Sequence, residues 1–152
     1  MAPTMTVAEP HYRIQGRGDG VVILEGGAEV AEFYSSLTED GLASVFGPIH
    51  EKVQVDDWGV ASHGLWGYYF PGHVLAAAGD CIDDVDAWYH VTNLHAGIWR
   101  YNTNGLLEGE NVYIDSASRR VEKLADDQVL TAQEALEFLQ PALEAELAST
   151  EF

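Results

Sequence analysis

The stretch that most constrains the fold is WRYNTNGLLEGE, a turn flanked by strand-forming residues that begins at Trp99. Asn104 and Gly105 both tolerate a positive φ, and an Asn-Gly pair in this setting is the strongest short-range signal for a β-hairpin. A two-residue loop would pair Trp99 with Glu110, and a four-residue loop would pair it with Glu108. In both registers aromatic rings and glutamates share one face, because side chains alternate with period two; a three- or five-residue loop would break this arrangement.

The rest of the chain contains helical and strand-like patterns. In GGAEVAEFYSSL the apolar residues follow the spacing of an amphipathic helix, which we expect to end near Gly41. The segments HEKVQVDDWGVAS and LWGYYFPGHVLAAAG predict a second antiparallel pair of strands, and RRVEKL is a candidate last strand. Thr131 and Glu134 form a capping box that begins a C-terminal helix at about 131–148, with a kink or restart at Pro141.

These elements predict one domain with a curved antiparallel sheet. A helix, a run of antiparallel strands and a final helix are typical of an α+β fold. The 152 residues, 47% of them hydrophobic, are enough to bury a full core. We expect residues 1–11 to be a flexible leader and residues 12–150 to form the domain, with a turn at Arg17, Gly18 and Asp19 between two strand-prone pieces.

The composition excludes several classes of partner. Asp and Glu number 25 against 7 Lys and Arg, a formal net charge of -18, and such a surface repels nucleic acid and anionic membranes. The single cysteine, Cys81, allows no internal disulfide. No apolar run approaches the ~20 residues of a membrane span, and MAPTMTVAEP lacks the parts of a signal peptide. We therefore expect a soluble, cytoplasmic protein.

Two phrases of the sequence resemble a known superfamily. LEGGAEVAEFY is similar to a Gly-x-Glu-x-Val-x-x-Phe helix, and AGIWRYNTNGLLEGENVYID to the closing hairpin, of the nuclear transport factor 2-like superfamily. This superfamily includes ketosteroid isomerases, scytalone dehydratase and SnoaL-like polyketide cyclases. The resemblance covers roughly residues 12 to 122. It implies a cone-shaped α+β barrel, in which a curved sheet wraps on helices around a cavity for a small organic ligand, and a homodimer formed through the convex side.

The sequence departs from this superfamily in two ways. Family members begin with a helical pair that caps the mouth of the cone, and the ten residues before His11 are too few to supply it. Either the N-terminus has been shortened, or the C-terminal helix or a partner chain closes the cone. The related cyclases carry a catalytic Asp on the strand before the hairpin turn, and the residue at that position here is Gly97. The acid-base residue of the cyclases is therefore not carried over.

One face of the hairpin gathers residues that can transfer protons. His95, Glu110 and Asn93 surround the gap left by Gly97, and Trp99 lies on the same side. A carboxylate held against an indole ring in a poorly solvated cavity has a raised pKa, which suits a general acid or base near neutral pH. We therefore predict His95 and Glu110 as an acid-base pair. The alternative is an ordinary amphipathic strand whose glutamates face water.

Asp57 and Tyr34 are the candidates for polarising a carbonyl group of a substrate. Asp57 shares a side with Val53 and Val55, so it is either a buried, functional carboxylate or the solvated end of its strand. Tyr34 lies on the expected amphipathic helix. Its hydroxyl either donates to a substrate carbonyl or is satisfied within the core.

Further aromatic and polar residues are candidates for substrate binding or, alternatively, for a core or subunit contact. His90 resembles a pocket histidine of the superfamily, although a core or interface histidine is at least as common. The full set is His90, Asn93, Trp99, Trp58, Trp66, Tyr69 and Tyr113. The P-loop, Rossmann and Gly-x-Ser-x-Gly motifs are absent, and the six histidines follow no metal-ligand spacing, so we predict no cofactor and no metal.

These features predict cofactor-independent proton transfer on a small, partly apolar organic molecule, as in an isomerase, a dehydratase (a lyase) or a polyketide cyclase. The second interpretation is a non-catalytic ligand carrier or dimeric assembly subunit of the same fold. If His95 and Glu110 lie in a closed cavity within hydrogen-bond reach, catalysis is favoured; if they are exposed or lie in a subunit contact, binding is favoured.

Overall fold

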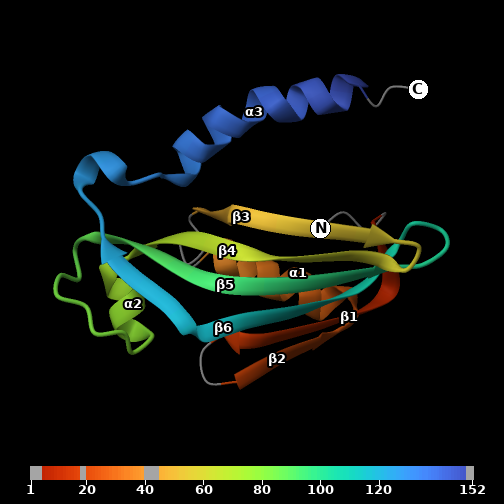
Figure 1. Cartoon of the computed structure of the whole chain (residues 1–152), viewed down its shortest axis with the longest axis horizontal. Coiled ribbons are helices and arrows are strands. Elements are labelled where there is room, and N and C mark those ends of the chain that lie inside the picture. Colours follow the sequence, from red (N-terminus) through yellow and green to blue (C-terminus); the bar gives the residue numbers. More distant parts are fainter. Residues whose placement is uncertain (1–4, 18–19, 40–44, 150–152) are drawn as a thin grey trace.

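A single curved sheet of six strands forms the centre of the molecule, in the order β2-β1-β6-β5-β4-β3 (Figure 1). The computed structural model describes residues 5–17, 20–39 and 45–149, so the turn expected at Gly18 and Asp19 and the helix end expected near Gly41 lie outside the described residues. The strands are β1 (Thr6–Arg17), β2 (Gly20–Glu25), β3 (Val45–Asp56), β4 (Gly59–Pro71), β5 (Trp88–Tyr101) and β6 (Leu107–Lys123).

The sheet is mixed, which corrects the prediction of a purely antiparallel one. β1 pairs with β6 in parallel, with Tyr12 beside Glu110 and Ile14 beside Val112. The other strand pairs are antiparallel. Alternation along a strand tells which side chains share a face, and it carries no information on the direction of the neighbouring strand.

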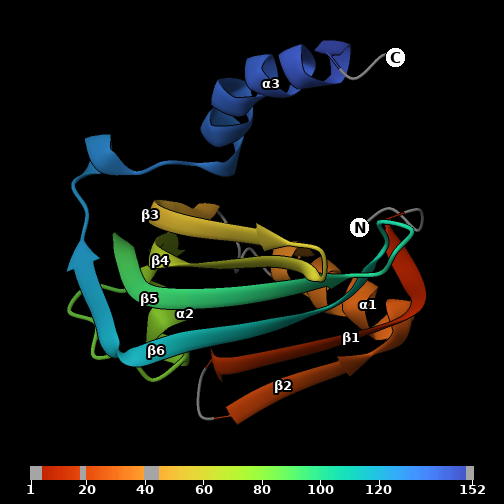
Figure 2. The same cartoon turned by 45° about the vertical axis from the view of Figure 1, so that its right-hand side comes forward.

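The helix α1 (Gly26–Glu39) covers one face of the sheet over β1 and β2 (Figure 2). Its apolar residues recur at helical spacing, so they form one stripe that can be buried against the strands. Val30 packs in a buried cluster with Tyr12, Leu24 and Leu107. This packing defines the inner face of the sheet as the face that carries Tyr12.

A second core lies further along the inner face, around the short helix α2 (Gly72–Ala77). Leu75 packs with Tyr89 and Val91 of β5, and all three side chains are buried. The sequence pattern predicts a strand through HVLAAAG, but β4 ends at Pro71 and the chain turns into α2. Proline has no backbone N–H to donate to a strand partner, and it is well tolerated at the start of a helix.

The hairpin between β5 and β6 forms as predicted, but with a different loop. Tyr101 pairs with Leu107, so five residues lie between the strands. Such a loop alone would destroy the expected register. Glu108 is an extra residue at the start of β6, a β-bulge, and it restores the pairing of Trp99 with Glu110.

At its N-terminal end the described chain differs from the sequence prediction. Residues 6–11, expected to belong to the flexible leader, lie in β1, where the parallel pairing with β6 holds them in the sheet. Among the described residues no helix precedes β1. RRVEKL is no separate strand, because β6 continues through it after an irregularity. The helix expected at about 131–148 is α3 (Ala132–Ser149), which runs through Pro141 without a restart.

The helix α3 stands apart from the sheet in both views (Figures 1 and 2). Its start is capped locally, because the amide of Glu134 donates to the Thr131 hydroxyl and the Glu134 carboxylate accepts from the Thr131 amide. Four of its large apolar side chains are more than half exposed: Leu136, Phe138, Leu139 and Leu143. No helix in the described part of the chain is both long and apolar enough to cross a lipid bilayer.

Candidate functional site

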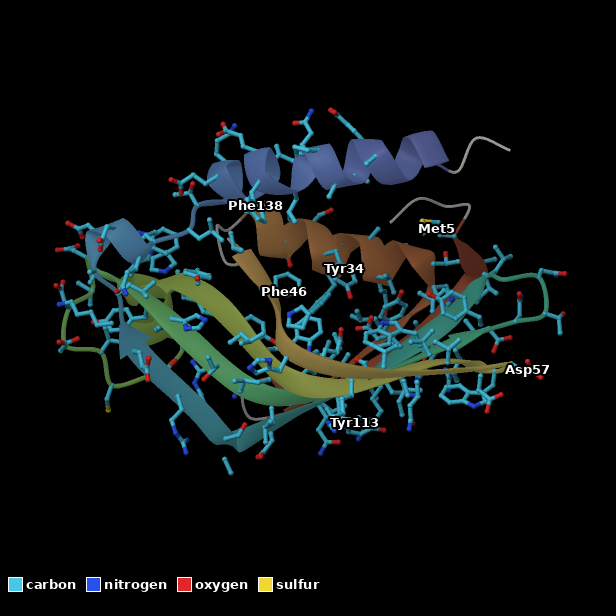
Figure 3. The ribbon with its side chains drawn as sticks, turned by 45° about the horizontal axis from the view of Figure 1, so that its top comes forward. Met5, Tyr34, Phe46, Asp57, Tyr113 and Phe138 are labelled. Carbon is cyan, nitrogen blue, oxygen red and sulfur yellow. The ribbon has the colours of Figure 1, made fainter. Side chains whose placement is uncertain are left out.

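Glu110 is a carboxyl group buried in the inner face of the sheet. It lies in β6, between Trp99 of β5 and Tyr12 of β1, and only 8% of its surface is exposed. Tyr34 reaches it from α1, across the layer between helix and sheet (Figure 3). Three separate elements therefore surround this carboxyl group with aromatic rings.

Two hydrogen bonds hold the Glu110 carboxyl group in place. The indole Nε1 of Trp99 donates to its Oε2 at 2.7 Å, and the hydroxyl of Tyr34 donates to its Oε1 at 3.4 Å. The Trp99 ring lies over Gly97, where an added Cβ would come within 2.2 Å of the ring atom Cη2. Gly97 thus leaves the space in which the indole turns its N–H toward Glu110.

Burial raises the pKa of Glu110, and the hydrogen bonds from Trp99 and Tyr34 offset only part of this effect. None of the ion pairs among the described residues includes Glu110. Burial also raises the pKa of Tyr12 to about 12, with further contributions from Glu110 and Tyr101. The carboxyl group therefore keeps its proton to a higher pH than an exposed glutamate does, while the neighbouring tyrosine stays neutral.

A small cavity lies next to this site, between α1 and the first half of β1. Its volume is about 250 Å³, and its walls are mostly apolar. Tyr34 lines the cavity, whereas Glu110 does not. Tyr34 is thus the residue that connects the cavity with the buried carboxyl group. The lining residues are Thr6, Val7, Ala8, Pro10, Gly27, Val30, Ala31 and Tyr34.

His95 does not pair with Glu110 as predicted. Its two ring nitrogens have no hydrogen-bond partner in the described part of the chain, and its ring contacts Trp66 at a centroid distance of 4.4 Å. The two predicted partners lie on the same face of the sheet, but the Trp99 ring covers Gly97, which lies between them on β5. The indole therefore occupies the gap in which the acid-base pair was expected to meet.

Two other predicted site residues lie in an exposed turn at the far end of the sheet. Asp57 and Trp58 connect β3 to β4, and both are exposed. Figure 3 shows Asp57 at the tip of this turn, well away from Tyr34. Asp57 is therefore the solvated end of its strand, the alternative that the sequence left open, and it does not join the site around Glu110.

The remaining predicted residues divide between the two faces of the sheet. Asn93 is buried on the inner face, and its amide donates to the backbone oxygen of Asp115 at 3.4 Å. Their positions in the register place His90, Tyr69 and Tyr113 on the outer face. The rings of His90 and Tyr69 are 5.1 Å apart, and the Tyr113 ring lies 5.7 Å from the guanidinium carbon of an arginine, Arg13. These three side chains point away from Glu110.

Tyr12 is the residue of this site that the sequence prediction missed. It is fully buried, and its ring meets that of Tyr34 edge to face at 6.4 Å. The alternation of Tyr12 and Ile14 in HYRI indicates one buried face, which is the signal that could have found it. The parallel pairing with Glu110 has no such local signal.

Comparisons with known proteins concern the fold. No protein-family model matches the chain, and no curated protein does. Several solved structures are similar to it, among them the following two. One is an NTF2-like protein of unknown function from Cytophaga hutchinsonii ATCC 33406, 14% identical over 74% of this chain and 80% of that one, with a TM-score of 0.49. The other is SalBIII, an epoxide hydrolase/cyclase-like enzyme in pyran ring formation in the polyether salinomycin, 13% identical over 80% of this chain and 79% of that one, with a TM-score of 0.49.

Similarity this distant says nothing about the reaction of this chain. The fold itself follows from the coordinates: a curved sheet of six strands holds α1 against its inner face. This is the cone-like α+β architecture that the sequence resemblance implies.

Proposed function

We propose that the chain binds a small, partly apolar organic molecule against the inner face of the sheet and catalyses proton transfer on it, with Glu110 as the acid-base group. One observation supports this most directly. A carboxyl group that is only 8% exposed is held by Tyr34 and Trp99, with no ion pair in the described residues to compensate its charge. A carboxyl group in such surroundings exchanges its proton closer to neutral pH than a solvated one.

The reactions of an isomerase, a dehydratase or a cyclase share one step, which is removal of a proton from a carbon next to a carbonyl group. In this step the Glu110 carboxylate takes the proton, and the electrons of the C–H bond move onto the carbonyl oxygen to give an enolate. A hydrogen-bond donor aimed at that oxygen lowers the barrier. Returning the proton to another carbon, or expelling a hydroxyl group as water, completes the reaction.

Tyr34 is suited to be this donor. Its hydrogen bond to Glu110 is long, at 3.4 Å, so little is lost when the hydroxyl turns toward a substrate oxygen. Trp99 donates at 2.7 Å and orients the carboxyl group throughout. The cavity lined by Tyr34 supports a ligand on this side, and its 250 Å³ is below the ~300 to 1,000 Å³ of typical ligand sites, which favours a small molecule.

The experiment uses 2-tetralone, a small bicyclic ketone, as the probe. In D2O its α-protons exchange for deuterium, and 1H NMR follows the loss of their signal. We expect the chain to accelerate the exchange and Glu110→Gln to reduce this acceleration by about a hundredfold, the typical contribution of general-base catalysis. Tyr34→Phe should reduce it less, and the matched control Glu108→Gln, which removes an exposed charge from the same strand, should leave it unchanged. Equal exchange rates with the wild type and Glu110→Gln would contradict the proposal.

The second candidate function is non-catalytic ligand binding by a homodimer, in which exposed apolar side chains on the outer face would form the contact. Ile23, Leu94 and Tyr113 are 54%, 49% and 41% exposed there. Light scattering after size-exclusion chromatography would test it, since Leu94→Glu should convert a dimer of this type to a monomer. A wild-type chain that is monomeric at all concentrations would exclude this candidate.

A further inference from the structure

The inner face carries a second group of buried polar atoms, separate from Glu110. They are Nδ1 and Nε2 of His95 in β5 and Nε1 of Trp66 in β4, and none of them has a hydrogen-bond partner within residues 5–17, 20–39 and 45–149. The two rings meet edge to face, with centroids 4.4 Å apart and planes at 78°, so the imidazole and the indole are in direct contact. Buried polar groups in folded proteins are nearly always hydrogen-bonded, and leaving one unpaired costs free energy.

The chemistry of these nitrogens restricts what can satisfy them. Burial lowers the pKa of His95, and the charge of Glu51 opposes this only in part, so the ring is neutral near pH 7. A neutral imidazole offers one N–H donor and one acceptor nitrogen, and the Trp66 indole offers a donor only. A hydroxyl group can bridge the two rings, because it accepts from the Trp66 N–H and donates to the bare nitrogen of His95. A carboxylate has no proton to donate, and an ammonium group accepts nothing.

The surroundings of the three nitrogens are flat and aromatic. Phe46 stacks on Trp66 with centroids 6.3 Å apart and on Tyr68 at 5.8 Å, and Tyr68 stacks on Phe70 at 6.1 Å. The register places Trp66, Tyr68 and Phe70 on the same face as His95. Such a row of stacked rings provides a wall on which another aromatic ring can lie.

This part of the inner face lies beside the region that α1 covers. α1 packs against β1 and β2 at one edge of the sheet, and β3 and β4 form the opposite edge (Figure 2). Phe46 is the outermost of these rings, because 52% of its surface is exposed while it stacks on Trp66. Exposed side chains change rotamer on the picosecond to nanosecond scale, so Phe46 is the side chain of this wall that can move most readily to admit a ligand.

We propose that His95 and Trp66 form a binding site for a neutral aromatic molecule that carries a hydroxyl group, with the ring on the Phe46–Tyr68 wall and the hydroxyl group between the Trp66 N–H and the bare nitrogen of His95. The complementarity of donors and acceptors selects this occupant. Glu51 next to His95 adds negative charge, which disfavours an anionic ligand. The proposal goes beyond proton transfer by Glu110 and does not require it.

The test uses 2-naphthol as the probe and isothermal titration calorimetry as the measurement, on the full chain at pH 7. Trp66→Phe and His95→Phe keep an aromatic ring and remove the nitrogens. Each should weaken 2-naphthol binding by about tenfold, the effect of one lost hydrogen bond at a site that then holds an unpaired group. His90→Phe is the matched control, because it changes a histidine of the same strand on the outer face, and it should bind as the wild type does.

A second measurement locates the site directly. In 15N NMR of the histidine rings, 2-naphthol should shift the His95 nitrogens and leave those of His90 unchanged. 2-Naphthoate, which has the same ring system with a carboxylate, should not shift the His95 signals. No saturable binding of 2-naphthol, equal affinity in the wild type, Trp66→Phe and His95→Phe, or unmoved His95 nitrogens would each overturn the proposal.

These outcomes are separable from those for Glu110. If Glu110→Gln exchanges 2-tetralone as fast as the wild type while 2-naphthol still distinguishes Trp66→Phe from the wild type, only the proposed proton transfer fails. If 2-naphthol binds the wild type and Trp66→Phe equally well while the exchange of 2-tetralone depends on Glu110, only the proposed His95 site fails.

Discussion

Replacing Glu110 by glutamine should change the stability of the chain in a pH-dependent way. Burial raises the pKa of Glu110 above its value in the unfolded chain. Between these two pKa values the folded state holds a proton that the unfolded state has released. The resulting stabilisation is complete below the unfolded pKa and is lost as the pH rises through the folded pKa. Glutamine has no such proton, so the variant gains stability relative to the wild type as the pH rises.

The size of the effect follows from the pKa difference. Each unit by which the folded and unfolded pKa values differ is worth about 1.4 kcal/mol, and for a chain of this length 1 kcal/mol moves Tm by about 2 to 4 °C. The glutamine oxygen can still accept the Trp99 N–H, while the contact with Tyr34 is weak at 3.4 Å. Changes in these hydrogen bonds shift Tm by the same amount at every pH. The raised pKa is therefore tested by how Tm changes with pH, and not by Tm at one pH.

The assay is thermal unfolding, monitored by circular dichroism at pH values between 5 and 8.5. This range stays above the sequence pI of about 4.3, because chains without net charge tend to associate. Glu108→Gln is the control, because it removes the same charge from an exposed position two residues away. We expect its Tm to run parallel to that of the wild type, whereas the Tm of Glu110→Gln should rise relative to both as the pH increases. If the Glu110→Gln and Glu108→Gln curves run parallel, Glu110 has no raised pKa and our account of the site is wrong.

Two further predictions concern the packing on the inner face. Gly97→Ala places a Cβ within 2.2 Å of the Trp99 ring, so it should lower the free energy of unfolding, measured by urea denaturation, by about 1 to 3 kcal/mol. Gly47→Ala is the control: its Cβ has open space, so it should change this free energy by less than about 0.5 kcal/mol. Leu75→Ala should cost about 2 to 5 kcal/mol because the side chain is 2% exposed, and Leu94→Ala, which is 49% exposed, should cost far less. Equal losses within either pair would refute the packing described.

The hairpin shows what a local signal can and cannot predict. Asn104 and Gly105 correctly indicate a turn between two strands, because the conformations they allow are set by their own covalent structure. The loop length depends also on where β6 begins to pair, and the bulge at Glu108 changes this by one residue. The pairing of Trp99 with Glu110 is thus the one expected for a two-residue loop, although the loop is longer.

The sequence predicts which residues of the candidate site share a face of the sheet, but not how their side chains are arranged on it. Period-two alternation correctly places His95 and Glu110 on one face of the sheet. It does not say how the side chains turn within that face. Gly97 reads in the sequence as an opening between the two groups, but an indole ring fills the space that a missing Cβ leaves. The ring then satisfies Glu110 with its N–H and separates it from His95.

Tyr12 belongs to the site through a contact that the sequence alone does not predict. It lies directly after the segment expected to be a leader, and it reaches Glu110 only because β1 runs parallel to β6. Two parallel strands are joined by a long crossover connection, so no turn motif in the sequence indicates that they pair. The raised pKa of Glu110 depends on the burial that β1 and α1 complete together, and a contact between elements so distant in the chain is decided by the packing of the whole domain. A chain that loses the pairing of β1 with β6 should therefore lose the unusual titration of Glu110 as well, even with every residue of the hairpin unchanged.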